Sequence, residues 1–285
     1  MILIQVVTGL NYMTPQPKIK TYNNTQNRLS VQVTLNGLSF LVTNSITKDA
    51  VFFLEKKEES LQSPEELLEI LDYHLSSIEE LKGDFEEVIL LYATHLYTLV
   101  PLSLFDPSRA SEYLKFNTKI LPGDFIATDE VTEADAIVVY VPFVNLNNYM
   151  FDRFGSFKYF HTSTLLLEHI LKAEKHNQEA KVYINIQQSS FDMIIVKKGI
   201  IKLINRYQFN TPEDLVYYVL FCFEQLKLNP DSVETILMGS IDKNDDNYAL
   251  LFTYIRNISF WQHPVLTRNL DKEAAHHCPI LKIAL

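Results

Sequence analysis

The chain has 285 residues, of which 47% are apolar and 12% aromatic, and its formal net charge is −10. A chain of this size and composition can bury roughly three quarters of its unfolded surface, which predicts one large or two medium domains with proper cores. The acidic balance repels phosphate backbones and anionic membrane surfaces, so we expect no nucleic acid among the partners.

Two cysteines are too few for a disulfide framework, and Cys222 stands in an apolar run, "YYVLFCFEQL", where it behaves as a small hydrophobe. The opening "MILIQVVTGL" lacks a basic region and a clear cleavage site, so it does not read as a signal peptide. Nothing approaches the roughly 20 apolar residues of a transmembrane helix. We therefore expect a cytoplasmic protein without an integral membrane segment.

The first predicted element is a β-hairpin in residues 31 to 42, "VQVTLNGLSFLV". Apolar residues alternate on both sides of Asn36-Gly37, and this dipeptide is the leading signal for a two-residue type I′ turn, in which both central residues need φ > 0. A hairpin turn is the simplest interpretation of this pair. A role in holding a ligand is the alternative.

A third strand, a capped helix and a buried strand follow. The strand is predicted at residues 51–55, and the helix begins at "SPEELLEIL", where Ser63 is the N-cap, Pro64 follows, and Glu66 can close a capping box. The run "EVILLYA" from Glu87 is typical of a buried strand. After a further helix, "DAIVVYVPF" is predicted as the last strand of this half, and "STLLLEHILKAEKHN" as a helix where two lobes join.

The same plan returns about 150 residues later, which is the signature of an internal repeat. The hairpin is matched by "VYINIQQSSFDMII" from Val182, the third strand by residues 200–207, the capped helix by "TPEDLVYYV" from Thr211, and the buried strand by "ETILMGS" from Glu234. The last strand of the second half is predicted in "NISFWQ". These matches keep their order and nearly constant spacing, so we infer a duplicated domain.

The order β-β-β-α-β-α-β resembles the ribonuclease-H-like fold, and two tandem copies resemble the actin-like ATPase superfamily. This implies an α/β protein with two lobes, each built on a mixed five-stranded sheet. The expected boundaries are a first lobe at 28–160, a linking helix at 161–179, a second lobe at 180–262 and a C-terminal tail at 263–285. The tail contains "CPILKIAL", which is apolar enough to dock on the body or on a partner.

More narrowly, "LYTLVPLSLFDPSRASEYLKFN" and "PFVNLNNYMFDRFG" resemble a small bacterial family of actin-like fold with no assigned activity. Its nearest relatives in character are the actin-like adaptors of pilus assembly. The resemblance implies a protein partner, whose identity the sequence does not give, and is compatible with a homo-oligomer.

In the superfamily, one hairpin turn from each lobe holds the phosphates, with the pattern Asp-x-Gly. The Asp binds the metal or its waters, because Mg²⁺ takes oxygen ligands, and the bare backbone of Gly lets the phosphate approach. Here Leu35 and Ile186 stand at the two Asp positions, Gly37 keeps one glycine, and Gln188 replaces the other. The adenosine-binding Gly-Gly-Ser/Thr turn keeps one glycine, Gly239.

The apolar replacements cannot coordinate Mg²⁺, so the resemblance predicts that ATP hydrolysis has been lost. We expect no catalytic residue, no metal and no cofactor, and a degenerate actin-like protein that acts as a scaffold or adaptor. The alternative is a site for ATP with Mg²⁺, or for another phosphorylated ligand, in the cleft between the lobes. Its candidate residues are Asn36, Gly37, Gln188, Ser189 and Gly239. A peptide-binding module that uses a sheet edge or the interlobe groove is a third interpretation.

Two other motifs are interpreted without a ligand. The stretch "DKNDDN" at 242–247 carries oxygen side chains with the spacing of a calcium loop, but Thr253 stands in place of the final Glu, so a solvated loop leading into a helix is favoured. The "HHC" at 276–278 lacks a distant fourth ligand, which favours a polar tail. No Gly-x-Ser-x-Gly elbow frames the serines of the turns.

Overall fold

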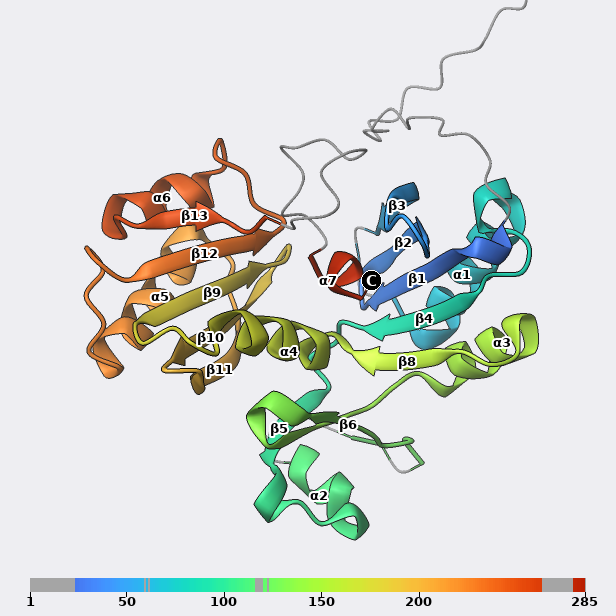
Figure 1. The fold of residues 1–285 in the computed structure, drawn as a ribbon, viewed down its shortest axis with the longest axis horizontal. Coiled ribbons are helices and arrows are strands. Elements are labelled where there is room, and N and C mark those ends of the chain that lie inside the picture. Colours follow the sequence, from blue (N-terminus) through green and yellow to red (C-terminus); the bar gives the residue numbers. More distant parts are fainter. Residues whose placement is uncertain are drawn as a thin grey trace, which may run out of the picture.

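The computed structural model describes residues 24–58, 60, 62–115, 120–121, 123–262 and 279–284. These form two lobes on either side of a central layer (Figure 1). The first lobe is a five-stranded sheet in the order β3-β2-β1-β4-β8, and the second is a five-stranded sheet in the order β11-β10-β9-β12-β13.

The two sheets have the same topology. In the first, β1 (Asn27–Thr34) pairs antiparallel with β2 (Gly37–Asn44) and parallel with β4 (Glu87–Tyr92), while β3 (Ala50–Lys57) and β8 (Lys158–His161) occupy the edges. In the second, β9 (Ala180–Ile186) pairs antiparallel with β10 (Ser190–Lys197) and parallel with β12 (Glu234–Gly239), with β11 (Ile200–Gln208) and β13 (Ile258–Phe260) at the edges. The expected actin-like architecture is confirmed.

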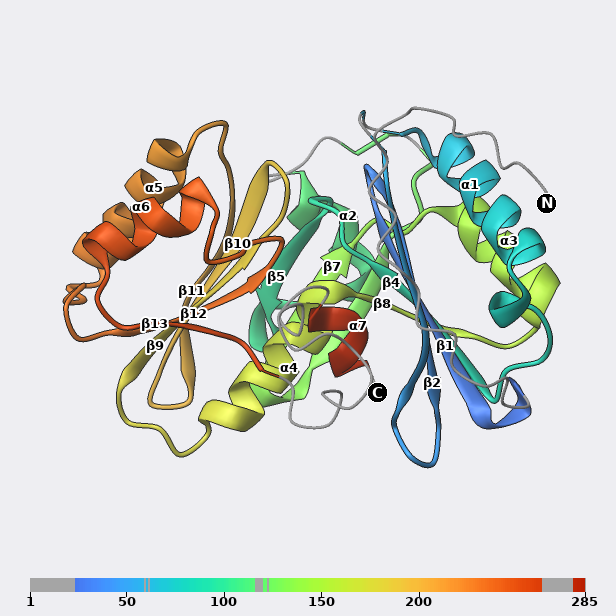
Figure 2. The ribbon, with the colours of Figure 1, turned by 90° about the horizontal axis from the view of Figure 1, so that it is seen from above.

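Equivalent helices cover the outer faces of the two sheets, as the view from above shows (Figure 2). They are α1 (Pro64–Ser77) and α3 (Val144–Phe154) on the first lobe, and α5 (Pro212–Gln225) and α6 (Asp246–Tyr254) on the second. Both predicted capping boxes are present, Ser63 with Glu66 and Thr211 with Asp214. These boxes satisfy backbone N–H groups that would otherwise lack a partner at the helix start.

The predicted fifth strand of the first lobe is wrong. Residues Ala136–Tyr140 form β7, the middle strand of a separate three-stranded sheet with β5 (Tyr97–Pro101) and β6 (Ala127–Val131), while β8 takes the place in the large sheet. This insertion also contains the short helix α2 (Ala110–Leu114). All five residues of β7 are buried, so their apolar run reads like a strand of the main sheet.

The central layer contains α4 (Thr162–Glu174) and α7 (Pro279–Ile283), and the insertion lies below it in the view of Figure 1. Alternation along β9 shows how this layer joins the lobes: Val182 and Ile184 pack in the core beneath α5, while Tyr183 belongs to the core of the first lobe. Ile280 and Leu281 of α7 are buried in that same core, so of the two docking places expected for the tail, the body and a partner, the structure shows the body. Cys278 and residues 276–277 lie outside the described residues.

Among the described residues, no helix combines the length and apolar character that crossing a bilayer requires. Cys222 is buried in α5, where its Sγ lies 3.1 Å from the Tyr207 hydroxyl. Burial raises the pKa of its thiol, as expected for a cysteine with a packing role.

Candidate functional site: the turns between the lobes

The two repeated hairpin turns meet between the lobes. The Nδ2 of Asn36, in the β1–β2 turn, donates to Oε1 of Gln188, in the β9–β10 turn, at 2.8 Å. A second contact joins the same region, since Nζ of Lys57 donates to Oγ of Ser240 at 3.3 Å. The fold therefore brings together the two segments whose counterparts hold phosphate in the superfamily, and here they contact each other directly.

The first turn is anchored to the segment that precedes α1. Its carbonyls accept backbone hydrogen bonds, Leu35 from Gln62 at 2.7 Å and Asn36 from Glu58 at 2.8 Å. Thr34 pairs with Gly37 across the turn, so Leu35 and Asn36 are its central residues, and neither has a positive φ. The predicted type I′ turn at Asn36-Gly37 is therefore wrong.

Gly37 has a packing role at the start of β2. Its φ is +154°, and a Cβ at this position would lie 2.1 Å from the carbonyl oxygen of Lys56 in β3. Glycine is needed here because the neighbouring strand approaches too closely for any side chain.

In the second lobe, Gly239 lets the end of β12 lie against the end of β9. Its φ is +87°, and a Cβ would lie 2.1 Å from the carbonyl oxygen of Ile186. That oxygen accepts from the backbone N–H of Ser240 at 2.7 Å, so it is already used by the protein. Ser189 lies in the adjacent turn, where its carbonyl accepts from the N–H of Phe209 at 3.0 Å.

The side chains at the two superfamily Asp positions are both in apolar surroundings. Ile186 is buried in the core of the second lobe, and the half-buried Leu35 packs against the core of the first. In the described part of the chain, no group of three or more His, Cys, Asp or Glu side chains is placed to hold a metal ion. The turns therefore offer amide and hydroxyl groups and one lysine, and no carboxylate at either position.

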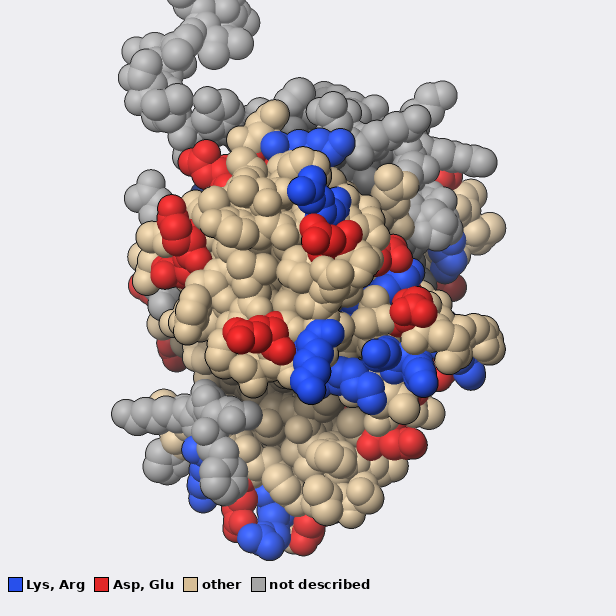
Figure 3. Space-filling model, turned by 90° about the vertical axis from the view of Figure 1, so that its left-hand side faces the viewer, with Lys and Arg blue, Asp and Glu red and all other residues tan. Residues whose placement is uncertain are grey.

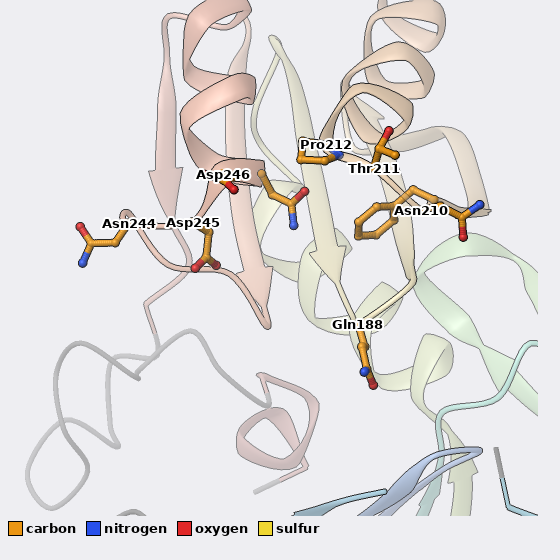
Figure 4. A pocket seen from close by; sticks show the side chains of 9 residues that line it. Gln188, Asn210, Thr211, Pro212, Asn244, Asp245 and Asp246 are labelled. Atoms are coloured by element: carbon orange, nitrogen blue, oxygen red, sulfur yellow. The ribbon is translucent and has the colours of Figure 1, made fainter. Parts of the chain in front are cut away.

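A polar cavity of about 460 Å³ lies beside Gln188. Figure 4 shows it between the start of α5, with Asn210, Thr211 and Pro212, and the start of α6, with Asp245 and Asp246. Its lining is rich in amides, which can recognise polar ligands, but its two carboxylates would repel phosphate.

The predicted calcium-like stretch forms part of this cavity. Oδ2 of Asp245 accepts from the backbone N–H of Asp242 at 2.7 Å, and α6 begins at Asp246. The favoured interpretation, a loop leading into a helix, is confirmed. Asp245 uses a carboxylate oxygen to order its own loop, as aspartate often does before a helix.

Sequence reasoning missed a buried polar cluster where the insertion meets α4. Asp129 of β6 accepts three hydrogen bonds: from the backbone N–H of His161 at 2.7 Å, from the hydroxyl of Thr164 at 2.9 Å and from the hydroxyl of Tyr140 at 3.1 Å. Burial raises the pKa of Asp129 to about 6, although these donors oppose the shift.

This cluster continues through His161 to the second lobe. The ring of His161 stacks on the ring of Tyr97, with the two ring centres 4.3 Å apart. The guanidinium of Arg206, on β11, also lies over the Tyr97 ring, 5.8 Å from its centre. Arg206 forms two 2.7 Å hydrogen bonds to Asp192 of β10. No local sequence signal marks Asp129, Tyr97 and His161, because they come from separate elements, β6, β5 and β8, that only the tertiary fold brings together.

The fold and the paired turns define a protein with the actin-like ATPase fold. A protein from Bacteroides thetaiotaomicron with this fold and unknown function matches with a TM-score of 0.73 and 20% identity, over 86% of this chain and 94% of that one. The structure of the PilM–PilN type IV pilus biogenesis complex matches with a TM-score of 0.61 and 10% identity, over 94% of this chain and 98% of that one.

Within this fold the chain belongs to a particular family. Residues 16–258 match the model of the family described as protein of unknown function, DUF3822. None of the curated proteins compared with the chain matches it. The likeness to the solved structures is below 25% identity and establishes the fold alone.

Proposed function

We propose that this protein is a non-catalytic member of the actin-like fold that acts as a cytoplasmic scaffold or adaptor. The observation that carries the proposal is the direct contact between the turns, Asn36 to Gln188 at 2.8 Å. A phosphate held between two turns needs that space and those donors. With the two side chains bonded to each other, a phosphate would have to break this contact before it could lie between the turns.

The apolar residues at the two Asp positions support the same proposal. Phosphoryl transfer depends on Mg²⁺ held by oxygen ligands, and neither Leu35 nor Ile186 supplies one. Opening the cleft would therefore expose a site that still lacks both carboxylates. The structural likeness to PilM, which was solved in complex with PilN, adds support for an adaptor.

A coupled ATPase assay with Mg²⁺ tests the proposal. We expect no turnover from the wild-type protein, and none from Asn36→Ala, because opening the turn contact leaves both Asp positions apolar. Turnover in the wild type that is lost in both Asn36→Ala and Gln188→Ala would overturn it. Both changes are at the protein surface, so folding of the variants is readily checked by circular dichroism.

The alternative function is binding of a phosphorylated ligand beside the turns. It is supported by the cavity next to Gln188, whose walls include the starts of two helices, where backbone N–H groups favour anions, and it is opposed by the carboxylates of Asp245 and Asp246 in the same walls. The candidate residues are those predicted from sequence, Asn36, Gly37, Gln188, Ser189 and Gly239.

A thermal-shift screen with ATP, ADP, GTP and sugar phosphates decides between the two functions. A ligand at a hundred times its dissociation constant adds about 2.7 kcal/mol of stability. A shift that disappears in Gln188→Ala would support this alternative, and the absence of any shift would remove it.

A further inference from the structure

The helix α7 lies between the lobes, although it belongs to neither copy of the repeat (Figure 2). It contacts α4 and β1. The side chains of Ile280, Leu281 and Ala284 are buried there, each with an exposed fraction of 8% or less. Nη1 of Arg28, on β1, donates to the carbonyl oxygen of Ala284 at 2.9 Å. The helix therefore covers part of β1 on the side that faces the second lobe.

Alternation along β1 shows which residues lie on this side. Val31 pairs with Phe40 of β2, whose ring contacts α1, so Val31 faces α1. Successive residues of a strand point to opposite sides of the sheet. Arg28, Ser30 and Gln32 therefore share the side turned toward the central layer, where Arg28 bonds α7. We call this face of β1, with these three residues, the α7 seat.

The α7 seat contains polar atoms that α7 does not satisfy. Oγ of Ser30, Oε1 of Gln32 and Nε of Arg28 are buried, and none has a hydrogen-bond partner in the described part of the chain. Ser30 is 0% exposed. A buried polar atom without a partner costs free energy, so native structures contain few of them. Three such atoms on one face of a strand indicate a seat that is poorly matched to the apolar helix above it.

The second lobe provides a comparison within the same chain. In the repeat, Lys181 and Tyr183 of β9 occupy the places of Ser30 and Gln32. Both are satisfied by Glu174 at the end of α4: its Oε1 accepts from the Tyr183 hydroxyl at 2.6 Å, and Nζ of Lys181 lies 3.2 Å from the same oxygen. The cover of the second sheet therefore matches the polar groups beneath it, whereas α7 does not.

The attachment of α7 is also slight. A helix of five residues is too short to be stable in isolation. Within the described residues it is held by the buried Ile280, Leu281 and Ala284, by the half-buried Ile283 and by the hydrogen bond from Arg28. Segments with few buried contacts open at a lower free energy than the core does. We therefore expect α7 to leave its seat while both sheets stay folded.

The occupant that the α7 seat accepts is visible, which distinguishes it from the outer surface. On the outer side of the second lobe, Lys and Arg side chains stand beside Asp and Glu side chains, so no single charge selects a partner there (Figure 3). The α7 seat accepts a short helix with apolar residues on its buried side. Ser30 and Gln32 add a preference for hydroxyl and amide side chains, which can both donate and accept.

We propose that α7 is an intramolecular ligand, and that the α7 seat docks a short helix of a partner protein that displaces it. The partner helix buries apolar side chains as α7 does, and presents hydroxyl or amide side chains to Ser30 and Gln32. This proposal rests on the adaptor function and names the chemistry of the partner's segment. Because a tethered segment competes at a high effective concentration, α7 makes docking conditional on its own release.

Fluorescence polarisation with a labelled synthetic peptide of residues 279–285, PILKIAL, tests whether α7 can be exchanged. The peptide is offered to the wild-type chain and to Leu281→Asp and Leu281→Ala, which weaken the hold of the tethered helix at a fully buried position. We expect binding at least about tenfold tighter to both variants than to the wild type, because the tethered helix competes at a millimolar effective concentration. A peptide that itself carries Leu281→Asp is the matched control and should not bind.

A second change locates the binding site of the peptide. In the Leu281→Ala chain, Arg28→Gln should weaken binding about fivefold, because it removes the donor to the carbonyl oxygen of Ala284. Arg256→Gln makes the same change at an exposed arginine of the second lobe, and should leave binding unchanged.

The polar mismatch of the α7 seat is tested in the wild-type chain by urea unfolding. Ser30→Ala should leave the midpoint unchanged or raise it, because the hydroxyl that it removes has no partner in the described part of the chain. Thr164→Val is the control, since it removes a buried hydroxyl that donates to Asp129 at 2.9 Å, and should lower the midpoint. Equal losses in the two variants would show that the Ser30 hydroxyl is satisfied, and would overturn the mismatch.

The remaining outcomes are distinct. No binding of PILKIAL to the folded Leu281 variants, equal binding to these and the wild type, or equal effects of Arg28→Gln and Arg256→Gln would each overturn the proposal. Circular dichroism checks folding, and unfolding of both Leu281 variants would also overturn it, because α7 would then be a required part of the core. None of these results depends on ATP turnover, so the ATPase assay tests the non-catalytic function separately.

Discussion

At the scale of single residues, His161 and Asp129 are titratable side chains of the buried polar cluster, and burial shifts the pKa of each. Nδ1 of His161 accepts from the N–H of Ser163 at 3.2 Å, and Nε2 lies 3.1 Å from the carbonyl oxygen of Thr94. Because Nδ1 is an acceptor, the neutral ring with its proton on Nε2 satisfies both contacts. Burial, with a contribution from the charge of Arg206, lowers the pKa of His161 to about 3.

The two groups have opposite effects on stability. Below pH 6.5, His161 is protonated in the unfolded chain but stays neutral in the folded protein. The folded state therefore loses stability as the pH falls toward about 3. Asp129 binds its proton more tightly when folded, so between about pH 4 and 6 it adds stability as pH falls. In that window the two contributions largely cancel.

Removing one group should therefore reveal the other. Between pH 7 and pH 5, the pKa shift of His161 alone lowers the free energy of unfolding by about 2 kcal/mol, and the pKa shift of Asp129 alone raises it by about 1 kcal/mol. We expect urea unfolding of Asp129→Asn to show a steeper loss of stability over this range than the wild type. His161→Gln, which does not titrate, should show the opposite change. Equal pH dependence in all three proteins would contradict this account.

A second prediction at this scale distinguishes a glycine that is required by close packing, Gly239, from one that is required only by its positive φ, Gly155. Gly239 and Gly155 both have positive φ, at +87° and +71°, but a Cβ meets the Ile186 carbonyl oxygen at 2.1 Å in the first case and nothing within 4 Å in the second. We expect Gly155→Ala to cost about 1 kcal/mol from backbone strain alone, and Gly239→Ala at least about 3 kcal/mol. Urea denaturation measures both, and similar losses would contradict the proposed close approach.

At the scale of elements, the sequence predicts what local chemistry determines. The hairpins follow from alternation of apolar residues, and the starts of α1 and α5 from Ser63 and Thr211 with their capping partners. The contact of Asn36 with Gln188 is not encoded locally, although the repeat places both residues at equivalent turns. The assignment of β7 failed because burial gives its run the same composition as a strand of the main sheet, while β8 has only four residues and a weak pattern.

The pairing of β10 with β11 contains a buried ion pair between Asp192 and Arg206, and the sequence alone does not reveal its contribution to the free energy of unfolding. Asp192 and Arg206 lie opposite each other in register and are almost entirely buried. We expect Arg206→Met to cost about 3 kcal/mol or more, because it leaves the Asp192 carboxylate buried without its partner. The double change Asp192→Leu with Arg206→Met should recover most of the loss in chemical denaturation. A double variant as unstable as the single one would show that the pair has a role beyond compensating its own burial.

At the scale of the whole molecule, the repeat suggests two independent lobes, but the packing joins them. Tyr183, Ile194 and Val196, from the inner face of the second sheet, belong to the same hydrophobic cluster as the core of the first lobe. The helices α4 and α7 lie in this shared layer (Figure 2). Contacts between lobes that are part of one apolar core favour cooperative unfolding, in contrast to the polar interfaces typical of independently moving domains.

We therefore expect a single unfolding transition. The only tryptophan, Trp261, follows β13 in the second lobe, is buried in the shared cluster and packs edge-on against His169 of α4 at 5.7 Å. Its fluorescence should change at the same urea concentration as the far-ultraviolet circular dichroism of the whole chain. Asn36→Ala should leave the two curves coincident, because an exposed hydrogen bond contributes about 1 kcal/mol at most to the link between lobes. Separate transitions would mean that the lobes unfold independently, and the turn contact would then account for more of their association than the shared core does.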